Sequence, residues 1–194
     1  FRLDAVAFIW KKNGASCVNL PETHEIVKLL RLIVNYLNPH ALIVTETNLP
    51  RKENLSYFGN NDEANWIYNF PLPPLILYTF LFEDSSKISG WSKSMPPAQI
   101  NNAYLNFIAS HDGIGMRPAE GILDNIILDK LFKRVKKNGG KFSFRKVESK
   151  NKVYEANITL FDALKRTDFD KDGIFAVERY IAAHAILLAL EGVP

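Results

Sequence analysis

The sequence predicts an α/β fold built on a parallel sheet, which can be either open or closed into a barrel. Two apolar runs at 2–8 and 41–46 flank a helical pattern at 21–37, and two apolar strands joined through a helix favour parallel pairing. Strand and helix patterns then continue to alternate along the chain without an internal repeat. This alternation is typical of the α/β class.

Each element has a local reason to form. The first helix begins at Pro21, which suits a first helical turn, and Asn38-Pro39 ends it. Apolar and polar residues alternate in two later segments, which predicts a small antiparallel pair. We predict further strands at 66–70 and 102–110, helices at 71–82, 122–138, 161–166 and 176–190, and the antiparallel pair at 141–145 and 153–159.

Composition excludes several classes of protein. The 194 residues carry a net charge of +3, and 47% of them are hydrophobic, so the chain has enough apolar material to avoid disorder. The basic residues are scattered, which argues against nucleic acid as a partner. No apolar run approaches the ~18 residues that a membrane span needs. Cys17 is the single cysteine, which excludes a disulfide scaffold.

The two ends of the sequence also carry information. The chain opens on what reads as a strand in progress and stops after a long apolar helix, so we expect a piece of a larger protein. No signal peptide precedes the first strand, which predicts a cytoplasmic location. The oligomeric state stays open.

Three acids lie at or near the ends of predicted parallel strands: Asp4, Glu46 and Asp112. In a (β/α)₈ barrel these ends build the active site. Two carboxylates in one cleft can divide glycoside chemistry between a nucleophile and a proton donor. Arg2, on the same strand face as Asp4, would keep that carboxylate ionised. The alternative is that the acids cap the helices that follow the strands.

Three motifs occur in this order along the chain: Phe1-Arg2-Leu3-Asp4-Ala5, Thr45-Glu46-Thr47-Asn48 and Ser110-His111-Asp112. They resemble catalytic motifs of the α-amylase-type glycoside hydrolase superfamily, and other segments resemble the sucrose phosphorylase subfamily within it. Residues 48–59 are more similar to glucosylglycerate phosphorylases and related sugar phosphorylases. The resemblance covers nearly the whole chain.

The resemblance implies a partial TIM (β/α)₈ barrel that runs from about its fourth strand to its seventh. Residues 1–112 would form this part of the catalytic barrel. Residues 113–160 would form a small excursion between the seventh strand and its helix. Residues 161–194 would form the barrel helix that leads to a missing eighth strand.

The resemblance also implies roles for the three acids. Asp4 would be the nucleophile that forms a glucosyl ester, and Glu46 would be the general acid/base. Asp112 would stabilise the transition state. We therefore expect a fragment of a retaining α-glucoside phosphorylase, whose parent transfers a glucosyl unit to phosphate and which is inactive when isolated.

Five further residues are candidates for binding substrate. Arg2 would orient the nucleophile and His111 would bond the donor sugar, as the resemblance implies. Thr47 and Asn48 would lie on the acceptor side, where the chain departs from sucrose phosphorylases proper. Arg117 is a candidate for binding phosphate or an anionic acceptor, although it can equally be a solvated loop residue.

The expected partners are a sugar and phosphate, and no cofactor or metal is expected. Asp168–Gly173 imitates the start of a calcium loop, but the twelfth position is Arg179 instead of a bidentate Glu. Two alternatives stay open: an α-glucoside hydrolase or transglucosidase that uses the same acids, and a non-enzymatic relative.

Overall fold

The computed structural model describes residues 1–147 and 150–194, which divide into two compact units. The units are described separately below. The first unit is formed by Phe1–Asn69, Pro97–Asn106 and Glu191–Val193, and the second by Phe70–Pro96, Phe107–Leu190 and Pro194.

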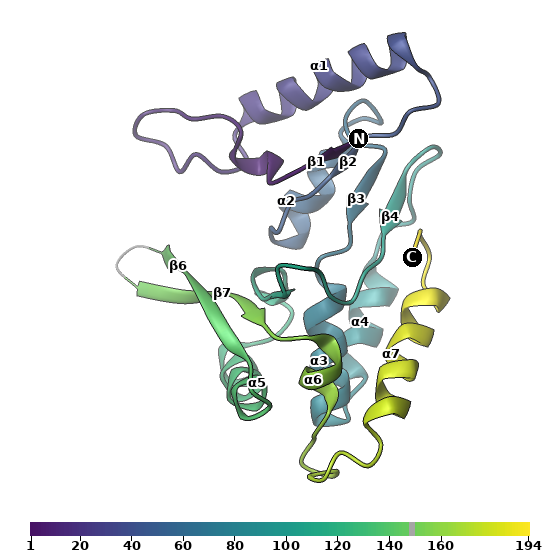
Figure 1. Cartoon of the computed structure of the whole chain (residues 1–194). Helices are drawn as coiled ribbons and strands as arrows, with labels where there is room; N and C mark the ends of the chain where they lie inside the picture. Colours follow the sequence, from purple (N-terminus) through teal and green to yellow (C-terminus); the bar gives the residue numbers. More distant parts are fainter. Residues whose placement is uncertain (148–149) are drawn as a thin grey trace. The chain divides into compact units, whose positions relative to one another are not determined.

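The first unit contains a four-stranded parallel sheet, which confirms the predicted α/β class (Figure 1). The strands follow one another in chain order, so each connection leads to the neighbouring strand. Arg2 pairs with Val44, and Thr45 pairs with Ile67. The strands are β1 (Arg2–Leu3), β2 (Val44–Thr45), β3 (Trp66–Tyr68) and β4 (Ala103–Leu105).

The helix predicted at 21–37 is confirmed as α1 (Pro21–Leu37), with Pro21 in its first turn. The strands are shorter than predicted. β1 is short because the chain leaves it at Asp4 and turns into a 3₁₀ helix at Val6–Phe8. The polar segment after β2 contains α2 (Arg51–Leu55) and a second 3₁₀ turn at Ser56–Phe58, which the sequence patterns did not predict.

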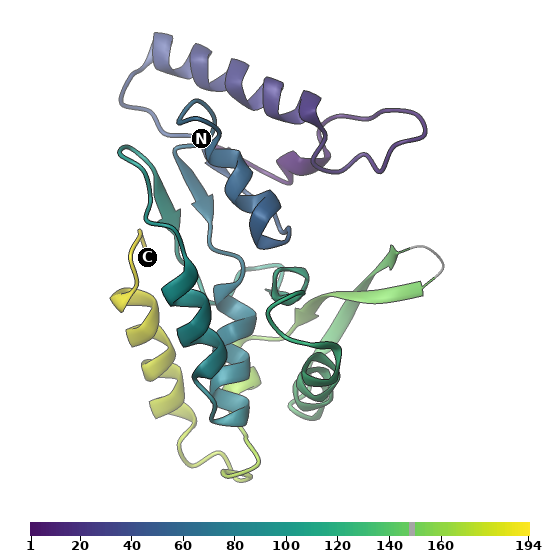
Figure 2. The same ribbon diagram turned by 180° about the vertical axis from the view of Figure 1, so that it is seen from behind.

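Helices dominate the second unit, and Figures 1 and 2 show α3, α4 and α7 side by side. Eight of the eleven residues of α3 are buried, as expected for a helix that is apolar on all sides. The sequence patterns did not predict α4. The helices are α3 (Leu72–Phe82), α4 (Ser86–Ser94), α5 (Asn125–Lys137), α6 (Leu160–Leu164) and α7 (Ala176–Ala189), with a 3₁₀ turn at Arg117–Ala119.

The predicted antiparallel pair is also confirmed in the second unit. β6 (Lys141–Val147) pairs with β7 (Lys150–Asn157), and β5 (Ile114–Gly115) pairs with the other side of β7. Asp124 begins α5 by accepting a hydrogen bond from the N–H of Ile127. The boundaries predicted at residues 112 and 160 stay a prediction. Within 1–147 and 150–194, no helix is long and apolar enough to cross a bilayer.

Candidate active site

Two of the predicted catalytic carboxylates follow neighbouring parallel strands. Asp4 comes directly after β1, and Glu46 comes directly after β2. The N–H of Glu46 donates to the carbonyl of Leu3 at 3.0 Å, and the N–H of Ala5 donates to Oε2 of Glu46 at 2.8 Å. The sheet therefore brings Asp4 and Glu46 to the same edge, as the sequence predicts.

The chain turns sharply at Ala5. This residue has φ 44° and ψ 35°, the left-handed conformation that side-chain-bearing residues avoid at a cost of about 1–2 kcal/mol. Such strained positions concentrate at functional sites. The strain accompanies the hydrogen bond to Glu46, so the turn after Asp4 is fixed to the second carboxylate.

Arg2 forms an ion pair with Asp4, with 2.6 Å between its Nη1 and Oδ1 of the carboxylate. The guanidinium lies 5.7 Å from the ring centre of Tyr68. Burial lowers the pKa of Arg2, but the hydrogen bond to Tyr68 and the charges of Asp4 and Glu46 outweigh it and raise that pKa overall. The side chain of Asp4 is 72% exposed, so Arg2 orients it without removing it from solvent.

Thr47, the residue after Glu46, is almost completely buried. Its hydroxyl donates to Oδ1 of Asn54, which is on α2, and Nδ2 of Asn54 donates to the carbonyl of Tyr68 at 2.8 Å. The Thr47 side chain therefore holds the loop in place from the inside. Its predicted contact with substrate stays a prediction.

Asn48 is 8% exposed, and its Oδ1 has no hydrogen-bond partner within the two described ranges. A buried carboxamide oxygen without a donor is costly to a fold. Its position two residues after Glu46 is where the sequence predicts contact with the acceptor part of a substrate.

His111, Asp112 and Arg117 lie in the second unit. Nε2 of His111 is 3.2 Å from Oδ2 of Asp112, and both side chains are exposed. Nδ2 of Asn157, at the end of β7, donates to the carbonyl of Asp112 at 3.0 Å and ties this loop to the sheet. The convergence of Asp112 with Asp4 and Glu46 stays a prediction.

A tight turn follows Asp112. Gly113 has φ +105°, and an added Cβ would lie 2.4 Å from the carbonyl oxygen of Ala156. Glycine is therefore required there both by conformation and by space. Arg117 comes a few residues later, at the start of a 3₁₀ turn, and is half-buried.

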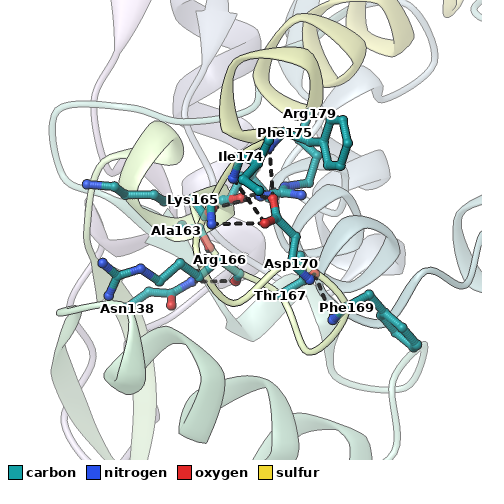
Figure 3. A network of polar contacts seen from close by, with 12 residues as sticks. Asn138, Ala163, Lys165, Arg166, Thr167, Phe169, Asp170, Ile174, Phe175 and Arg179 are labelled. Atoms are coloured by element: carbon teal, nitrogen blue, oxygen red, sulfur yellow. Dashed lines mark hydrogen bonds and ion pairs between the residues drawn. The ribbon is translucent and has the colours of Figure 1, made fainter.

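The segment that imitates a calcium loop is used in another way (Figure 3). Asp170 accepts hydrogen bonds from the N–H groups of Gly173, Ile174 and Phe175, and it also pairs with Arg179 at 2.9 Å. Its carboxylate thus joins the segment 173–175, just before α7, to Arg179 in the first turn of that helix. In the part of the chain that the structure describes, no three His, Cys, Asp or Glu side chains are grouped to hold a metal.

The second unit has a cavity of about 610 Å³, which is lined by the start of α5, by β7 and by the loop between Met116 and Asp124. None of the predicted site residues lines it. The cavity therefore does not support the predicted chemistry, which rests on the carboxylates at the strand ends.

Sequence reasoning did not assign Ala5, Asn54 or Tyr68 to the site. Asn54 begins an Asn-Leu-Ser triplet that matches a glycosylation sequon, and Tyr68 has the pattern of a core aromatic residue. Their positions could have indicated a place in the site. Tyr68 ends a strand of the same sheet, and Asn54 lies in the stretch that resembles glucosylglycerate phosphorylases.

Comparison with known proteins addresses the family. The chain is 45% identical to the glucosylglycerate phosphorylase of Allomeiothermus silvanus and 40% identical to that of Escherichia coli K12. Both matches span 100% of this chain. The chain is a homologue of glucosylglycerate phosphorylases. This result confirms the resemblance to sugar phosphorylases.

The same homologues are much longer. This chain spans 35% of the Allomeiothermus protein and 34% of the Escherichia coli protein. A crystal structure of sucrose 6F-phosphate phosphorylase from Thermoanaerobacter thermosaccharolyticum matches all of this chain and 36% of its own, with a TM-score of 0.81 and 24% identity. That likeness establishes the fold. No family model matches the sequence.

Proposed function

We propose that this chain is the central part of the catalytic barrel of a retaining α-glucoside phosphorylase. The observation that carries the proposal is the hydrogen bond from Ala5, next to Asp4, to the carboxylate of Glu46. It places the two acids at one edge of a parallel sheet, where barrel enzymes build their active sites. Homology to glucosylglycerate phosphorylases over the whole chain supports the same reaction.

In the first step, Asp4 attacks the anomeric carbon and forms a glucosyl ester. The bond from that carbon to the leaving oxygen breaks, and Glu46 gives its proton to this oxygen. Arg2 pairs with Asp4 and orients its carboxylate for the attack. Asp112 and His111 would hold hydroxyl groups of the sugar.

In the second step, phosphate attacks the same carbon from the opposite side, and the ester to Asp4 breaks. Glu46 accepts a proton from the incoming phosphate, and two inversions give α-glucose 1-phosphate with retained configuration. Arg117 is our candidate for holding phosphate. The chemistry uses phosphate as co-substrate and needs no cofactor.

The proposed substrate class depends on the residues expected near the leaving group and on the relatives of the chain. Asn48 follows Glu46 by two residues, and in this proposal it lies beside the leaving group of the substrate. Relatives named glucosylglycerate phosphorylases direct the proposal to a glucoside whose leaving group carries hydroxyls and a carboxylate. A sucrose-like glucoside is the second choice.

The four parallel strands correspond, in this proposal, to about the fourth to seventh strands of the barrel. The second-unit strands β5, β6 and β7 form the excursion that follows the seventh. A chain of this extent is expected to be inactive by itself, so the tests below use the longer protein that contains it, here called the full-length enzyme. We place that enzyme in the cytoplasm, where phosphate is abundant.

The test is product analysis with and without phosphate. The full-length enzyme is incubated with glucosylglycerate, and proton NMR follows the anomeric signals. Phosphate-dependent formation of α-glucose 1-phosphate is the expected result. Release of free glucose at the same rate in both reactions would identify a hydrolase instead, and transfer to a second sugar would identify a transglucosidase.

A further inference from the structure

We propose that Asn54 is a positioning residue for Glu46, acting through Thr47 and Tyr68. This inference rests on the role of Glu46 as proton donor in the proposed function. It adds that the loop after β2 depends on a buried hydrogen-bond bridge for the placement of its carboxyl group.

The bridge uses both ends of one carboxamide. Asn54 is 4% exposed, its Oδ1 accepts from the hydroxyl of Thr47, and its Nδ2 donates to the carbonyl of Tyr68 at 2.8 Å. The carbonyl of Tyr68 can only accept, which assigns the amide nitrogen to that side and leaves the oxygen for Thr47. The orientation of Asn54 is therefore dictated by its partners.

The local structure needs such a bridge. The ladder of β2 covers only Val44–Thr45, and the N–H of Glu46 adds one last backbone bond, to the carbonyl of Leu3. Thr47 is the next residue, and its side chain is buried and bonded to α2. Because the bridge also bonds the last residue of β3, it fixes Thr47 to the neighbouring strand.

The bridge continues to the other carboxylate. The ring of Tyr68 faces the guanidinium of Arg2, and Arg2 pairs with Asp4. The residue after Asp4 is Ala5, and its N–H donates to Oε2 of Glu46. The contacts thus form a closed circuit through both acids, so a change at Asn54 is transmitted to the separation of the two carboxylates.

Proton transfer makes the proposal testable. A displaced Glu46 slows departure of a leaving group that needs a proton, such as glycerate. It does not slow departure of fluoride, which leaves as a stable anion. A purely structural role for Asn54 would reduce both reactions by the same factor, because it would lower the amount of competent enzyme.

The experiment compares glucosylglycerate with α-glucosyl fluoride in the full-length enzyme. For Thr47→Val, which removes the hydroxyl but keeps the shape, we expect kcat/KM for glucosylglycerate to fall by about 10- to 100-fold, the range of general acid catalysis. The rate with α-glucosyl fluoride should stay within about threefold. Thr47→Ser restores the hydroxyl and should restore the rate with glucosylglycerate.

Asn54→Asp gives a second reading, since it keeps the size and the acceptor for Thr47 but removes the donor to Tyr68. The same split between donors is expected. Ser56→Ala is the matched control, because Ser56 is exposed and its hydroxyl donates to the carbonyl of Glu53, outside the bridge. It should change neither rate.

An equal loss with both donors in either variant overturns the proposal, as does an unchanged rate with glucosylglycerate in both. The split concerns formation of the glucosyl ester and does not depend on phosphate. If the wild-type enzyme makes no glucose 1-phosphate but the split is found, phosphorolysis fails and the role of Asn54 stands.

Discussion

The backbone N–H of Ala5 donates a hydrogen bond of 2.8 Å to the side chain of Glu46, 41 residues further along the chain. Ala5 reaches this position in a left-handed conformation, directly after Asp4. A strained residue next to one carboxylate is therefore bonded to the other. The precision of the pair comes from this contact as well as from the two short strands, and the predictions that follow test its chemistry and its surroundings.

Asp4→Asn should abolish formation of the covalent glucosyl-enzyme, because an amide is a poor nucleophile. We expect kcat in the full-length enzyme to fall by on the order of 10⁴-fold or more, as for loss of other enzyme nucleophiles. Mass spectrometry after incubation with a 2-fluoro-glucosyl donor should find the label on Asp4 in the wild type alone. Labelling of another residue would refute the assignment.

Arg117→Ala should raise the KM for phosphate by about tenfold or more, since a charged hydrogen bond to the anion is lost. Initial rates of glucose 1-phosphate formation at varied phosphate concentration provide the measurement. Lys133→Ala, at an exposed position of α5, is the control and should leave this KM unchanged. An unchanged KM in Arg117→Ala removes the proposed role.

Gly113→Ala and Gly121→Ala form a matched pair in the loops after Asp112. Both glycines have positive φ, but an added Cβ meets nothing within 4 Å at Gly121 and lies 2.4 Å from the carbonyl oxygen of Ala156 at Gly113. We expect Gly121→Ala to lower the free energy of unfolding by about 1 kcal/mol, from conformation alone. Gly113→Ala should cost clearly more, measured by urea unfolding; equal costs would contradict the contact.

Asp170 should make the start of α7 sensitive to acid. Hydrogen bonds from Phe175 and Ile174 and the pair with Arg179 lower its pKa from 3.8 to about 2. Because the folded-state pKa is the lower one, this contribution to stability is present above about pH 4 and is lost as the pH falls towards 2. The protection of the amide groups of 173–175, corrected for the intrinsic exchange rate at each pH, should therefore fall over this range.

Asp170→Asn tests that origin by hydrogen exchange in the full-length enzyme. The variant should show weaker protection of these amides at neutral pH and a smaller change between pH 4 and pH 2. Asp84, whose pKa is also lowered to about 2 by the hydroxyl of Tyr78, keeps its own acid dependence in the variant. Unaltered protection at neutral pH would mean that the carboxylate does not hold this end of α7.

The sequence predicts those parts of the molecule that depend on local pattern. The helix at 21–37, the antiparallel pair and the parallel pairing of the first two strands follow from periodicity and from Pro21. The exact ends of the strands do not follow, because β1 stops at Leu3 for a reason that lies in the backbone of Ala5. α4 was missed because serine and glycine make its pattern weak.

The candidate site was likewise predictable only in part. Asp4 and Glu46 were found because acids at strand ends have a chemical meaning, and Arg2 because it shares a strand face with Asp4. The bridge through Asn54 was invisible, since its partners are 7 and 14 residues away and meet only in the folded chain. Hydrogen bonds between loops leave no periodic trace in a sequence.

The apolar character of α3 has a consequence for biosynthesis. The buried side chains that cover this helix, from Ile88 to Ala183, are all translated after it. At about 5–20 residues per second, roughly 5 to 20 s pass before the ribosome has made the hundred residues that follow. During that interval the apolar side chains of the nascent segment 72–82 are not yet covered by the rest of the chain. We therefore expect the segment to bind ribosome-associated chaperones.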